Sequence, residues 1–230
     1  MKVKLISYSQ QAINPSEQDD IELQLFNLQD LVAYCARVSN PANQSNTETS
    51  ERLIRYLVKH KHWSPLEMVS ACLEIETTRD IARQFLRHRS FSFQEFSQRY
   101  ADPTQELSFV LREARLQDTK NRQNSIEVDD VELQEQWNIL QNRVISEAKT
   151  AYKWAIDNGI AKEQARSVLP EGNTISRLYV NGTLRSWVHY IELRSSNGTQ
   201  KEHIEIAKAC AMVISKVFPM ISDFVEKIDG

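Results

Sequence analysis

The order of strand-like and helix-like segments restricts the folds open to this chain more than any other feature of its 230 residues. Patterns typical of β-strands occur over residues 2–8, 69–77, 106–111 and 174–180. Helical spacing of apolar residues occurs over residues 28–38, 49–61, 78–89, 128–158, 161–169, 183–193 and 200–218. Because strands and helices do not alternate regularly, the sequence predicts an α+β fold. Helices would pack on a central, mostly antiparallel or mixed sheet, and a doubly wound parallel fold is disfavoured.

The segments between these elements contain no repeat, no low-complexity linker and no convincing boundary, so we expect one domain over residues 1–230. Polar loops are predicted around residues 18–20 and over residues 113–127, and residues 90–100 suit a loop that leads into an extended segment. In the long helix, one apolar stripe should face the core: Leu133, Trp137, Leu140, Val144, Ile145, Ala148, Tyr152 and Ala155.

Composition excludes several classes of protein. The net charge of −3 argues against a dedicated nucleic-acid binder. No apolar run approaches the roughly 18 residues of a membrane span, and residues 1–9 are too short and polar for a signal peptide, so we expect a cytoplasmic protein. The three cysteines are widely spaced and form no Cys-x-x-Cys pair, which disfavours a disulfide framework or a zinc site. No metal site is predicted.

Residues 87–100, with the sequence RHRSFSFQEFSQRY, gather three arginines, a histidine and three serines around one carboxylate. Planar guanidinium groups match phosphate oxygens bidentately, so the segment favours a phosphate-bearing ligand. Phe91, Phe93 and Phe96 interleave with these residues and could stack on a flat ligand, although core packing is the favoured interpretation.

Glycine-rich phosphate loops are missing. The five glycines form neither Gly-x-Gly-x-x-Gly nor a Walker loop, and neither Gly-x-Ser-x-Gly nor His-Glu-x-x-His occurs. Side chains must therefore hold any phosphate. The helix over residues 78–89, with Thr78 as N-cap, would place Arg83, Gln84, Arg87 and His88 on one face, opposite its apolar residues.

Three other segments allow both a structural and a ligand-binding interpretation. Ser64 and Glu67 are spaced as a capping box, but could equally contact a ligand. Arg166 could form an exposed ion pair with Glu163 or bind an anion. Arg185 and His189 share helical spacing with Glu192 or Arg194, opposite the apolar residues of the same helix.

At this point the chain resembles the flavin-dependent thymidylate synthases. The residues that carry the resemblance are Arg87-His88-Arg89-x-x-Ser92-x-x-x-x-Ser97-x-Arg99-Tyr100, and the family's flanking segments occur in the family's order. Those segments are Ala36-Arg37-Val38-Ser39, His62-x-Ser64-Pro65-x-Glu67, Ala82-Arg83-Gln84, Ala165-Arg166-x-Val168-Leu169-Pro170 and Leu184-Arg185-Ser186-Trp187-x-His189 through Leu193-Arg194.

The resemblance implies a methyltransferase of de novo dTMP biosynthesis that carries out the reductive methylation of dUMP to dTMP. Methylenetetrahydrofolate would supply the carbon, FAD the hydride, and NADPH would reduce the flavin. It further implies that no cysteine nucleophile is needed, which agrees with the absence of a cysteine in a charged, activating sequence setting. The family is homotetrameric, with active sites shared between subunits. The expected partners are dUMP, folate and NADPH. Binding to nucleic acid or to a membrane is not expected.

The site residues implied by the resemblance fall into two sets. Positions that hold dUMP are Gln84, Arg87, Glu95, Ser97, Gln98, Arg99, Arg166 and Arg194. Positions that contact FAD are Ser39, His62, Ser64, Arg87, His88, Arg89, Gln94, Glu95, Arg185 and His189. Ser97 and Arg99 suit the phosphate, and Arg194 is the expected catalytic residue, because its cation would stabilise negative charge that develops on the uracil ring.

Two positions depart from the family pattern. Gln94 stands where many members have Asn, and Met68 stands where some have His. A competing hypothesis remains a nucleotide- or RNA-binding module that uses the same arginines without redox chemistry. The acidic net charge weighs against long nucleic acid as its ligand.

Overall fold

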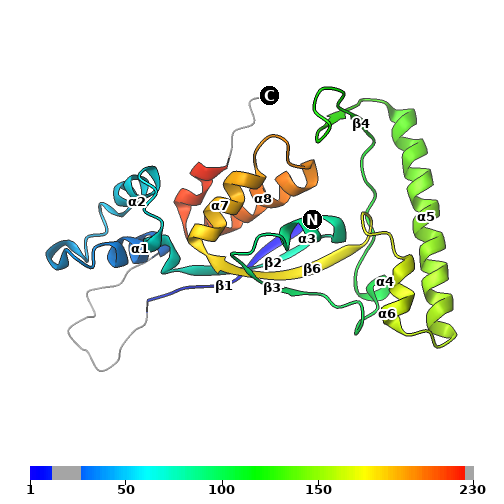
Figure 1. Cartoon of the computed structure of the whole chain (residues 1–230), viewed down its shortest axis with the longest axis horizontal. Helices are drawn as coiled ribbons and strands as arrows, with labels where there is room; N and C mark the ends of the chain where they lie inside the picture. Colours follow the sequence, from blue (N-terminus) through cyan, green and yellow to red (C-terminus); the bar gives the residue numbers. More distant parts are fainter. Residues whose placement is uncertain (12–26, 226–230) are drawn as a thin grey trace.

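A central antiparallel sheet organises the fold (Figure 1). The computed structural model describes residues 1–11 and 27–225, so the predicted polar loop around residues 18–20 lies outside the described residues. The strand order is β1 (Lys2–Tyr8), β2 (Ser70–Thr78), β6 (Ile175–Thr183) and β3 (Ser92–Glu95), and every neighbouring pair is antiparallel. The mixture of helices with an antiparallel sheet confirms the predicted α+β class.

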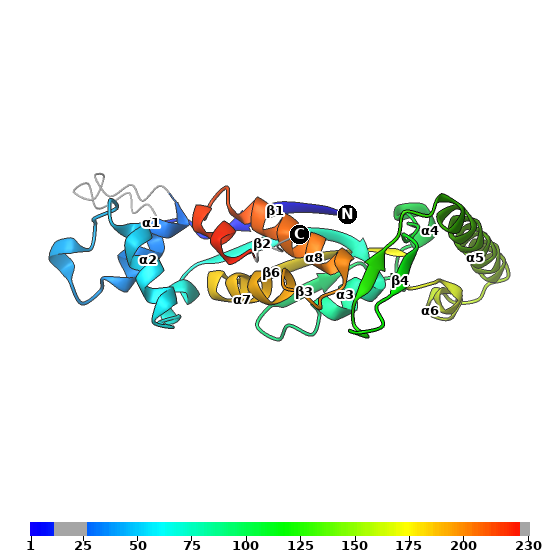
Figure 2. The ribbon, with the colours of Figure 1, turned by 90° about the horizontal axis from the view of Figure 1, so that it is seen from above.

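Three helices cover one face of this sheet: α3 (Arg79–Phe85), α7 (Leu184–Arg194) and α8 (Lys201–Ile214) (Figures 1 and 2). Alternate residues of β2, among them Leu73 and Ile75, are fully buried beneath them, as the period of two along a strand requires. Trp187 of α7 is also fully buried, and its Nε1 donates to the carbonyl of Ala71 over 3.0 Å. The core that positions the candidate site therefore lies between this face and the three helices.

Phe91 and Phe93 belong to this core, which confirms core packing over ligand stacking for these two rings. Phe91 is 8% exposed and contacts Trp187 at 4.7 Å between ring centroids. A Cβ at position 182 would lie 2.3 Å from the Phe91 ring, so this close approach requires Gly182.

One end of the sheet carries α1 (Leu28–Ala36), a 3-10 turn (Pro41–Asn43), α2 (Ser50–Lys59) and the 3-10 helix η3 (Ser64–Glu67). The 3-10 helix η5 (Pro219–Phe224) follows α8 and packs against α7 and α8. Helix α1 begins at the N-cap Asn27, whose side chain accepts a hydrogen bond from the backbone N–H of Asp30.

The opposite end carries the long helix α5 (Val131–Asp157), together with α4 (Pro103–Glu106), α6 (Lys162–Ala165) and the 3-10 helix η4 (Arg166–Val168) (Figure 1). A second, small hydrophobic cluster joins α5 to α6 and the end of η4, through Tyr152, Ala155, Ala165 and Leu169. Within the described ranges, no helix is both long and apolar enough to cross a membrane.

Two predictions for this end were wrong. Residues 106–111 form no strand beyond an isolated bridge between Phe109 and Thr174. Glu106 instead belongs to the helical turn of α4. This turn is favoured because Oδ1 of its N-cap Asp102 accepts a hydrogen bond of 2.8 Å from the N–H of Thr104, and because Pro103 suits the first helical position. Residues 113–127, predicted as a loop, contain the hairpin of β4 (Arg115–Gln117) and β5 (Ser125–Glu127).

Three helical predictions need correction. Helix α3 ends at Phe85, so Arg87 and His88 lie in the following turn, and α8 ends at Ile214 rather than near residue 218. The apolar stripe of α5 is only half buried. Ile145, Ala148, Tyr152 and Ala155 are buried, whereas the others are 39–54% exposed: Leu133, Trp137, Leu140 and Val144.

Candidate active site

A polar cluster lies where α3, α7 and α8 meet, and we call it the central cluster: Gln84, His88, Arg194, Gln200 and His203. Arg194, the last residue of α7, donates from Nε to Nε2 of His88 over 3.0 Å. Gln84 of α3 reaches α8 at two points: its Nε2 donates to Oε1 of Gln200 over 3.0 Å, and its Oε1 lies 3.2 Å from Nδ1 of His203. The cluster thus joins two predicted dUMP residues, Gln84 and Arg194, to one predicted FAD residue, His88.

The two histidines of the central cluster are neutral. Burial, followed by the nearby cation of Arg194, lowers the pKa of His88 to about 4. Burial also lowers the pKa of His203 to about 3, with Arg194 and His88 as further causes. Because Nε2 of His88 accepts from Arg194, its proton resides on Nδ1. The guanidinium of Arg194 is therefore the positive charge of this cluster, held in a half-buried setting that suits an anion or a polarised carbonyl oxygen.

A second group lies where α7 begins, against η3. Arg185 pairs with Glu67, and the ring of His189 meets Trp63 edge-on at 4.4 Å between centroids. Burial, with Arg185 as the next cause, lowers the pKa of His189, while Glu192 acts in the opposite direction. His62 and Ser64 are exposed beside this group. The capping-box interpretation is wrong, because the N-cap of η3 is Trp63 and Ser64 caps nothing.

Helix α7 directs its charged residues to two different sides. Arg185 and Arg194 are nine positions apart, which at about 3.6 residues per turn places them on opposite faces and roughly 14 Å apart along the axis. His189 and Glu192 line a shared surface pocket together with Phe224. Glu192, rather than Arg194, is therefore the residue that accompanies His189.

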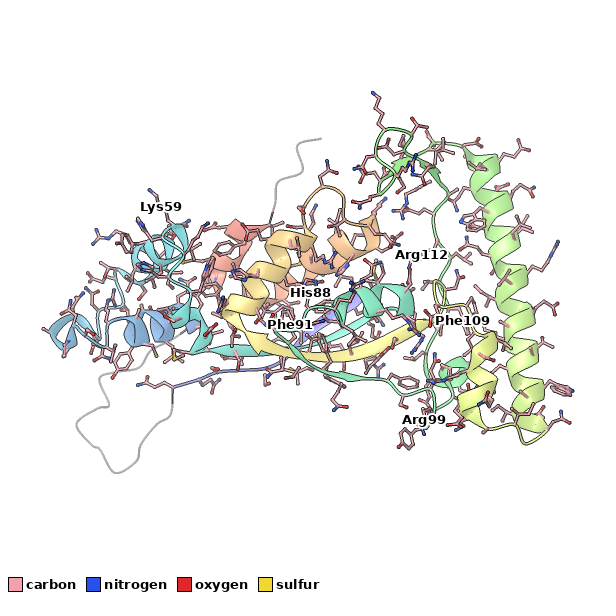
Figure 3. The ribbon with its side chains drawn as sticks, viewed as in Figure 1. Lys59, His88, Phe91, Arg99, Phe109 and Arg112 are labelled. Atoms are coloured by element: carbon pink, nitrogen blue, oxygen red, sulfur yellow. The ribbon has the colours of Figure 1, made fainter. Side chains whose placement is uncertain are left out.

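A third group, which we call the Arg99 group, lies beside α6: Ser97, Arg99, Glu163 and Arg166. Nε of Arg99 is 3.5 Å from the carboxylate of Glu163, and both side chains are more than half exposed, at 60% and 51%. Nε of Arg166 donates to the backbone carbonyl of Glu163 over 3.4 Å, so the predicted Arg166–Glu163 ion pair is replaced by this bond. Figure 3 shows Arg99 at the end of the molecule near α4 and α6, away from His88.

The residues between these groups differ in what they offer a ligand. Arg87 and Arg89 are exposed, and neither has an ion-pair partner in the described ranges. Gln94 is exposed on β3. The carboxylate of Glu95 is already engaged by the Ser176 hydroxyl at 2.7 Å and by Arg79 at 3.2 Å.

Two further predicted residues differ sharply in accessibility. Gln98 is 3% exposed, and its side-chain Nε2 is buried without a hydrogen-bond partner in the described residues. Ser39 is exposed in the turn after α1. One chain therefore distributes the predicted site residues over several places rather than one pocket.

Gln200 and His203 belong to the central cluster but were not predicted from the sequence. Both belong to the first turn of α8, with Gln200 as its N-cap. Their spacing of three residues places them on one side of the helix start, and this was the signal available in the sequence.

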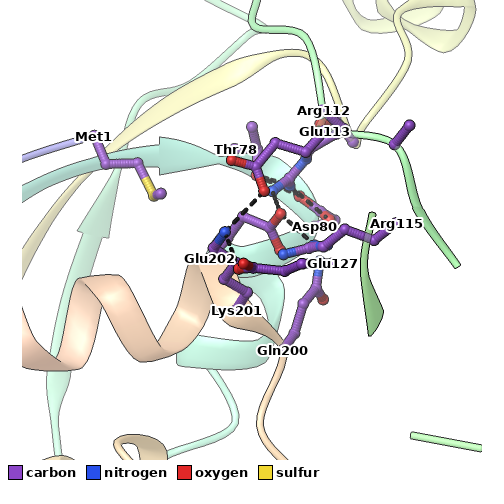
Figure 4. Close-up of polar contacts among 12 residues, drawn as sticks. Met1, Thr78, Asp80, Arg112, Glu113, Arg115, Glu127, Gln200, Lys201 and Glu202 are labelled. Carbon is purple, nitrogen blue, oxygen red and sulfur yellow. Dashed lines mark hydrogen bonds and ion pairs between the residues drawn. The ribbon is translucent and has the colours of Figure 1, made fainter. Parts of the chain in front are cut away.

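An ion network anchors the same helix start to the β4–β5 hairpin (Figure 4). Glu202 accepts from Arg115 over 2.5 Å and lies 3.2 Å from Arg112, which also reaches Asp80 at 2.9 Å. Lys201 pairs with Glu113 and Glu127 at 2.9 and 2.5 Å. Burial acts to raise the pKa of Glu202, but its backbone hydrogen bond and the two arginines outweigh this effect, so the net pKa lies below its usual range.

In residues 1–11 and 27–225, no group of three or more His, Cys, Asp or Glu side chains is placed so that it could hold a metal ion. The three cysteines are free, and burial raises the pKa of each thiol. These pKa shifts disfavour thiolates, which agrees with an activity that needs no cysteine nucleophile.

Comparison with known proteins extends this description. The family model described as "Thymidylate synthase complementing protein" matches residues 23–220. The chain is 45% identical over 225 residues to a probable flavin-dependent thymidylate synthase of Paramecium bursaria Chlorella virus 1, covering 96% of this chain and 97% of the relative. It is 48% identical over 196 residues to the flavin-dependent thymidylate synthase of Synechocystis sp., covering 85% and 88%.

A solved structure shows the same fold. It is the crystal structure of a UMP/dUMP methylase, PolB from Streptomyces cacaoi, bound with 5-Br dUMP, and it matches with a TM-score of 0.77 at 24% identity. The match covers 97% of this chain and 93% of that chain.

Proposed function

The chain belongs to the family of flavin-dependent thymidylate synthases, and on that basis we propose how its residues bind dUMP and FAD for the reductive methylation of dUMP to dTMP. The protein is a methyltransferase, and its cofactor is FAD. The observation that carries the assignment of residues is the bond of 3.0 Å between Arg194 and His88, which joins the expected catalytic cation to an expected flavin-binding residue.

The uracil end of dUMP is assigned to the central cluster. Arg194 offers a guanidinium whose Nε is already fixed by His88, so its terminal N–H groups remain to meet a carbonyl oxygen or a deprotonated ring nitrogen. A fixed cation at this point stabilises negative charge that develops on the ring during the reaction. Gln84 supplies an amide beside it, and Arg87 supplies a further exposed cation.

The phosphate of dUMP is assigned to the Arg99 group. The exposed guanidinium of Arg99 forms one long ion pair of 3.5 Å, which a phosphate dianion could replace. Ser97 and Arg166 add a hydroxyl and a second guanidinium, and the buried Gln98 adds an amide whose Nε2 has no hydrogen-bond partner in the described residues. Glu95 needs to release Arg79 or Ser176 before its carboxylate can bind a ligand fully.

FAD is assigned to a path of exposed and half-exposed residues that leads from the turn after α1 to the central cluster. The residues present fit this group, because Arg87 and Arg89, unpaired within the described residues, suit a pyrophosphate and the neutral imidazole of His88 suits an uncharged ring system. The path consists of Ser39, His62, Ser64, Arg185, His189, Arg87, His88, Arg89, Gln94 and Glu95. When bound and reduced, the flavin supplies the hydride, and the side chains bind and orient both ligands.

Each complete site is proposed to combine residues of different subunits in a homotetramer. The Arg99 group and the central cluster belong to one dUMP site by family pattern, yet they lie at separate places in one chain (Figure 3). The exposed apolar stripe on α5 supports association, because Trp137 and Val144 are 41% and 54% exposed on a single chain.

Methylenetetrahydrofolate and NADPH are the proposed co-substrates, and the cytoplasm is the proposed location. Each turnover consumes one carbon and a pair of reducing electrons, so external co-substrates must supply both. A reducing compartment agrees with three free cysteines.

An assay of the purified, FAD-loaded protein tests this function. It should retain the visible absorbance of bound flavin and form dTMP only when dUMP, methylenetetrahydrofolate and NADPH are all present. A protein that binds neither FAD nor dUMP would contradict the proposal and favour a binding module of another kind.

A further inference from the structure

The imidazole of His203 is an unusual component of the apolar core. Its side chain is fully buried, and its ring lies 5.9 Å from the ring of Phe85 and 5.7 Å from that of Tyr190, measured between centroids. A phenylalanine could occupy this place without the cost of burying two ring nitrogens. Packing alone therefore does not explain a histidine at this position.

The hydrogen bonds of His203 point to one partner. Nδ1 lies 3.2 Å from Oε1 of Gln84, whereas Nε2 is buried and has no hydrogen-bond partner in the described part of the chain. Burial, ahead of the nearby Arg194 and His88, lowers the pKa of His203 to about 3, so the ring is neutral. Since an amide oxygen only accepts, Nδ1 of the neutral ring is the donor.

Gln84 is consequently held at both ends of its amide by α8. Its Oε1 accepts from His203, and its Nε2 donates to Gln200 over 3.0 Å. An amide has two acceptor lone pairs and two N–H donors. Gln84 therefore keeps one lone pair and one N–H, in a fixed orientation, for a ligand.

The helix start that carries these two residues is itself fixed. Glu202, next to His203 in sequence, is tied to Arg112 and Arg115 at 3.2 and 2.5 Å. The start of α8 therefore cannot rotate without breaking buried ion pairs. Because Gln200 and His203 at this helix start are bonded to the amide of Gln84, the amide is held in a fixed position as well.

We propose that His203 is a positioning residue which, together with Gln200, orients the Gln84 amide so that its free N–H and free lone pair meet the uracil edge of dUMP. This inference rests on the proposed function, because it takes Gln84 as part of the dUMP site. Uracil carries donors and acceptors side by side on its edge, so an oriented amide binds it better than an amide that can flip.

A double-mutant cycle in the FAD-loaded full-length enzyme tests the proposal, with dUMP affinity measured by titration calorimetry. His203→Phe keeps a ring between Phe85 and Tyr190 but removes the donor. It should weaken dUMP binding by about five- to tenfold, the loss expected for one neutral hydrogen bond. In a Gln84→Met background, the same substitution should change dUMP binding by less than about twofold, because the bond is already absent.

His203→Asn provides the rescue, since its amide nitrogen can occupy the place of Nδ1 and donate to Gln84. It should bind dUMP within about threefold of wild type. Lys208→Gln, at an exposed position of α8, is the matched control and should behave as wild type. FAD affinity, measured by flavin fluorescence, should be unchanged in every variant.

The outcomes separate the alternatives. Equal loss of dUMP affinity from His203→Phe in both backgrounds, or an asparagine variant no better than the phenylalanine variant, contradicts positioning through Gln84. Unchanged dUMP binding by His203→Phe also overturns the inference. A wild-type enzyme that fails to bind dUMP contradicts the proposed function itself, and the inference falls with it.

Discussion

Arg194 and His88 are 106 positions apart in sequence, yet Nε of the arginine lies 3.0 Å from Nε2 of the histidine. The bond joins the end of α7 to the turn after α3, and it needs a neutral imidazole, because a protonated ring has no lone pair to accept with. It thereby couples the orientation of Arg194, the proposed catalytic cation, to the protonation state of one histidine.

Because His88 and His203 are neutral in the folded state, we predict that the stability of the fold decreases at acidic pH. The pKa values of His88 and His203 in the folded state are about 4 and about 3, below the 6.5 of an unperturbed histidine. Between these values and pH 6.5, the unfolded chain binds more protons than the folded chain, so stability falls as the pH falls.

His203→Phe isolates one of these contributions. Urea unfolding of wild type and His203→Phe at pH 7 and pH 5 should show a smaller loss of stability in the variant, because its unfolded state no longer takes up that proton. An equal loss in both proteins would show that His203 is not held neutral in the folded state.

Arg99→Ala should weaken dUMP binding far more than FAD binding. Arg99 is exposed and only loosely paired with Glu163, so it is free to contact a phosphate. Loss of one charge-assisted contact costs about 1.5–3 kcal/mol. Separate titrations of the two ligands measure the effect, with Arg122→Ala on the exposed hairpin as control. Equal weakening of both ligands would place Arg99 elsewhere.

His189→Ala should show the reverse pattern, with the affinity for flavin reduced first. Its ring is fixed edge-on against Trp63, on the face of α7 that Arg194 does not share. Fluorescence titration with FAD, followed by dUMP titration of the loaded enzyme, measures both affinities. A variant that loses only dUMP affinity would assign His189 to the other ligand.

Periodicity in the sequence predicted three of the four strands of the sheet, β1, β2 and β6, and the helices around it, because a two-residue or 3.6-residue apolar pattern records burial directly. Strand β3 lies in a segment predicted as a loop that leads into an extended segment. Periodicity failed at residues 106–111, where Asp102 and Pro103 favour a helical turn. The prediction that the apolar stripe of α5 faces the core also failed for the N-terminal half of this helix. An apolar stripe indicates that a surface is covered, but not whether the same chain or another subunit covers it. The expectation of one domain stays a prediction.

The roles of the predicted site residues stay predictions, and the way the structure groups them could not be predicted from the sequence. The separation of Arg185 from Arg194 follows from helix geometry that only exact helix bounds could reveal. For His203, the spacing of three residues from Gln200 could not reveal the hydrogen bond to Gln84, which is 119 positions away in sequence.

Glu202→Gln should destabilise the fold strongly. Arg112 and Arg115 are 17% and 11% exposed, so the substitution would leave two poorly solvated cations without their shared carboxylate. Breaking a buried pair costs about 3–5 kcal/mol. Lys153→Ala, which removes an exposed pair with Asp157, is the control and should cost less than about 0.5 kcal/mol. Urea unfolding of the three proteins gives both values, and similar small losses would contradict a structural role for the network.

Val144→Asp should break the proposed assembly without unfolding the chain. Val144 is 54% exposed on the apolar stripe of α5, so in an isolated chain a charge at this position meets water. In an interface the same carboxylate would lose its hydration without gaining a partner, a cost of several kcal/mol. Light scattering coupled to size exclusion should then show smaller particles, and dTMP formation should fall because sites shared between subunits are lost. Ser146→Asp adds the same charge on the opposite, exposed side of α5 and should leave mass and activity unchanged. An intact tetramer in Val144→Asp would place the interface elsewhere.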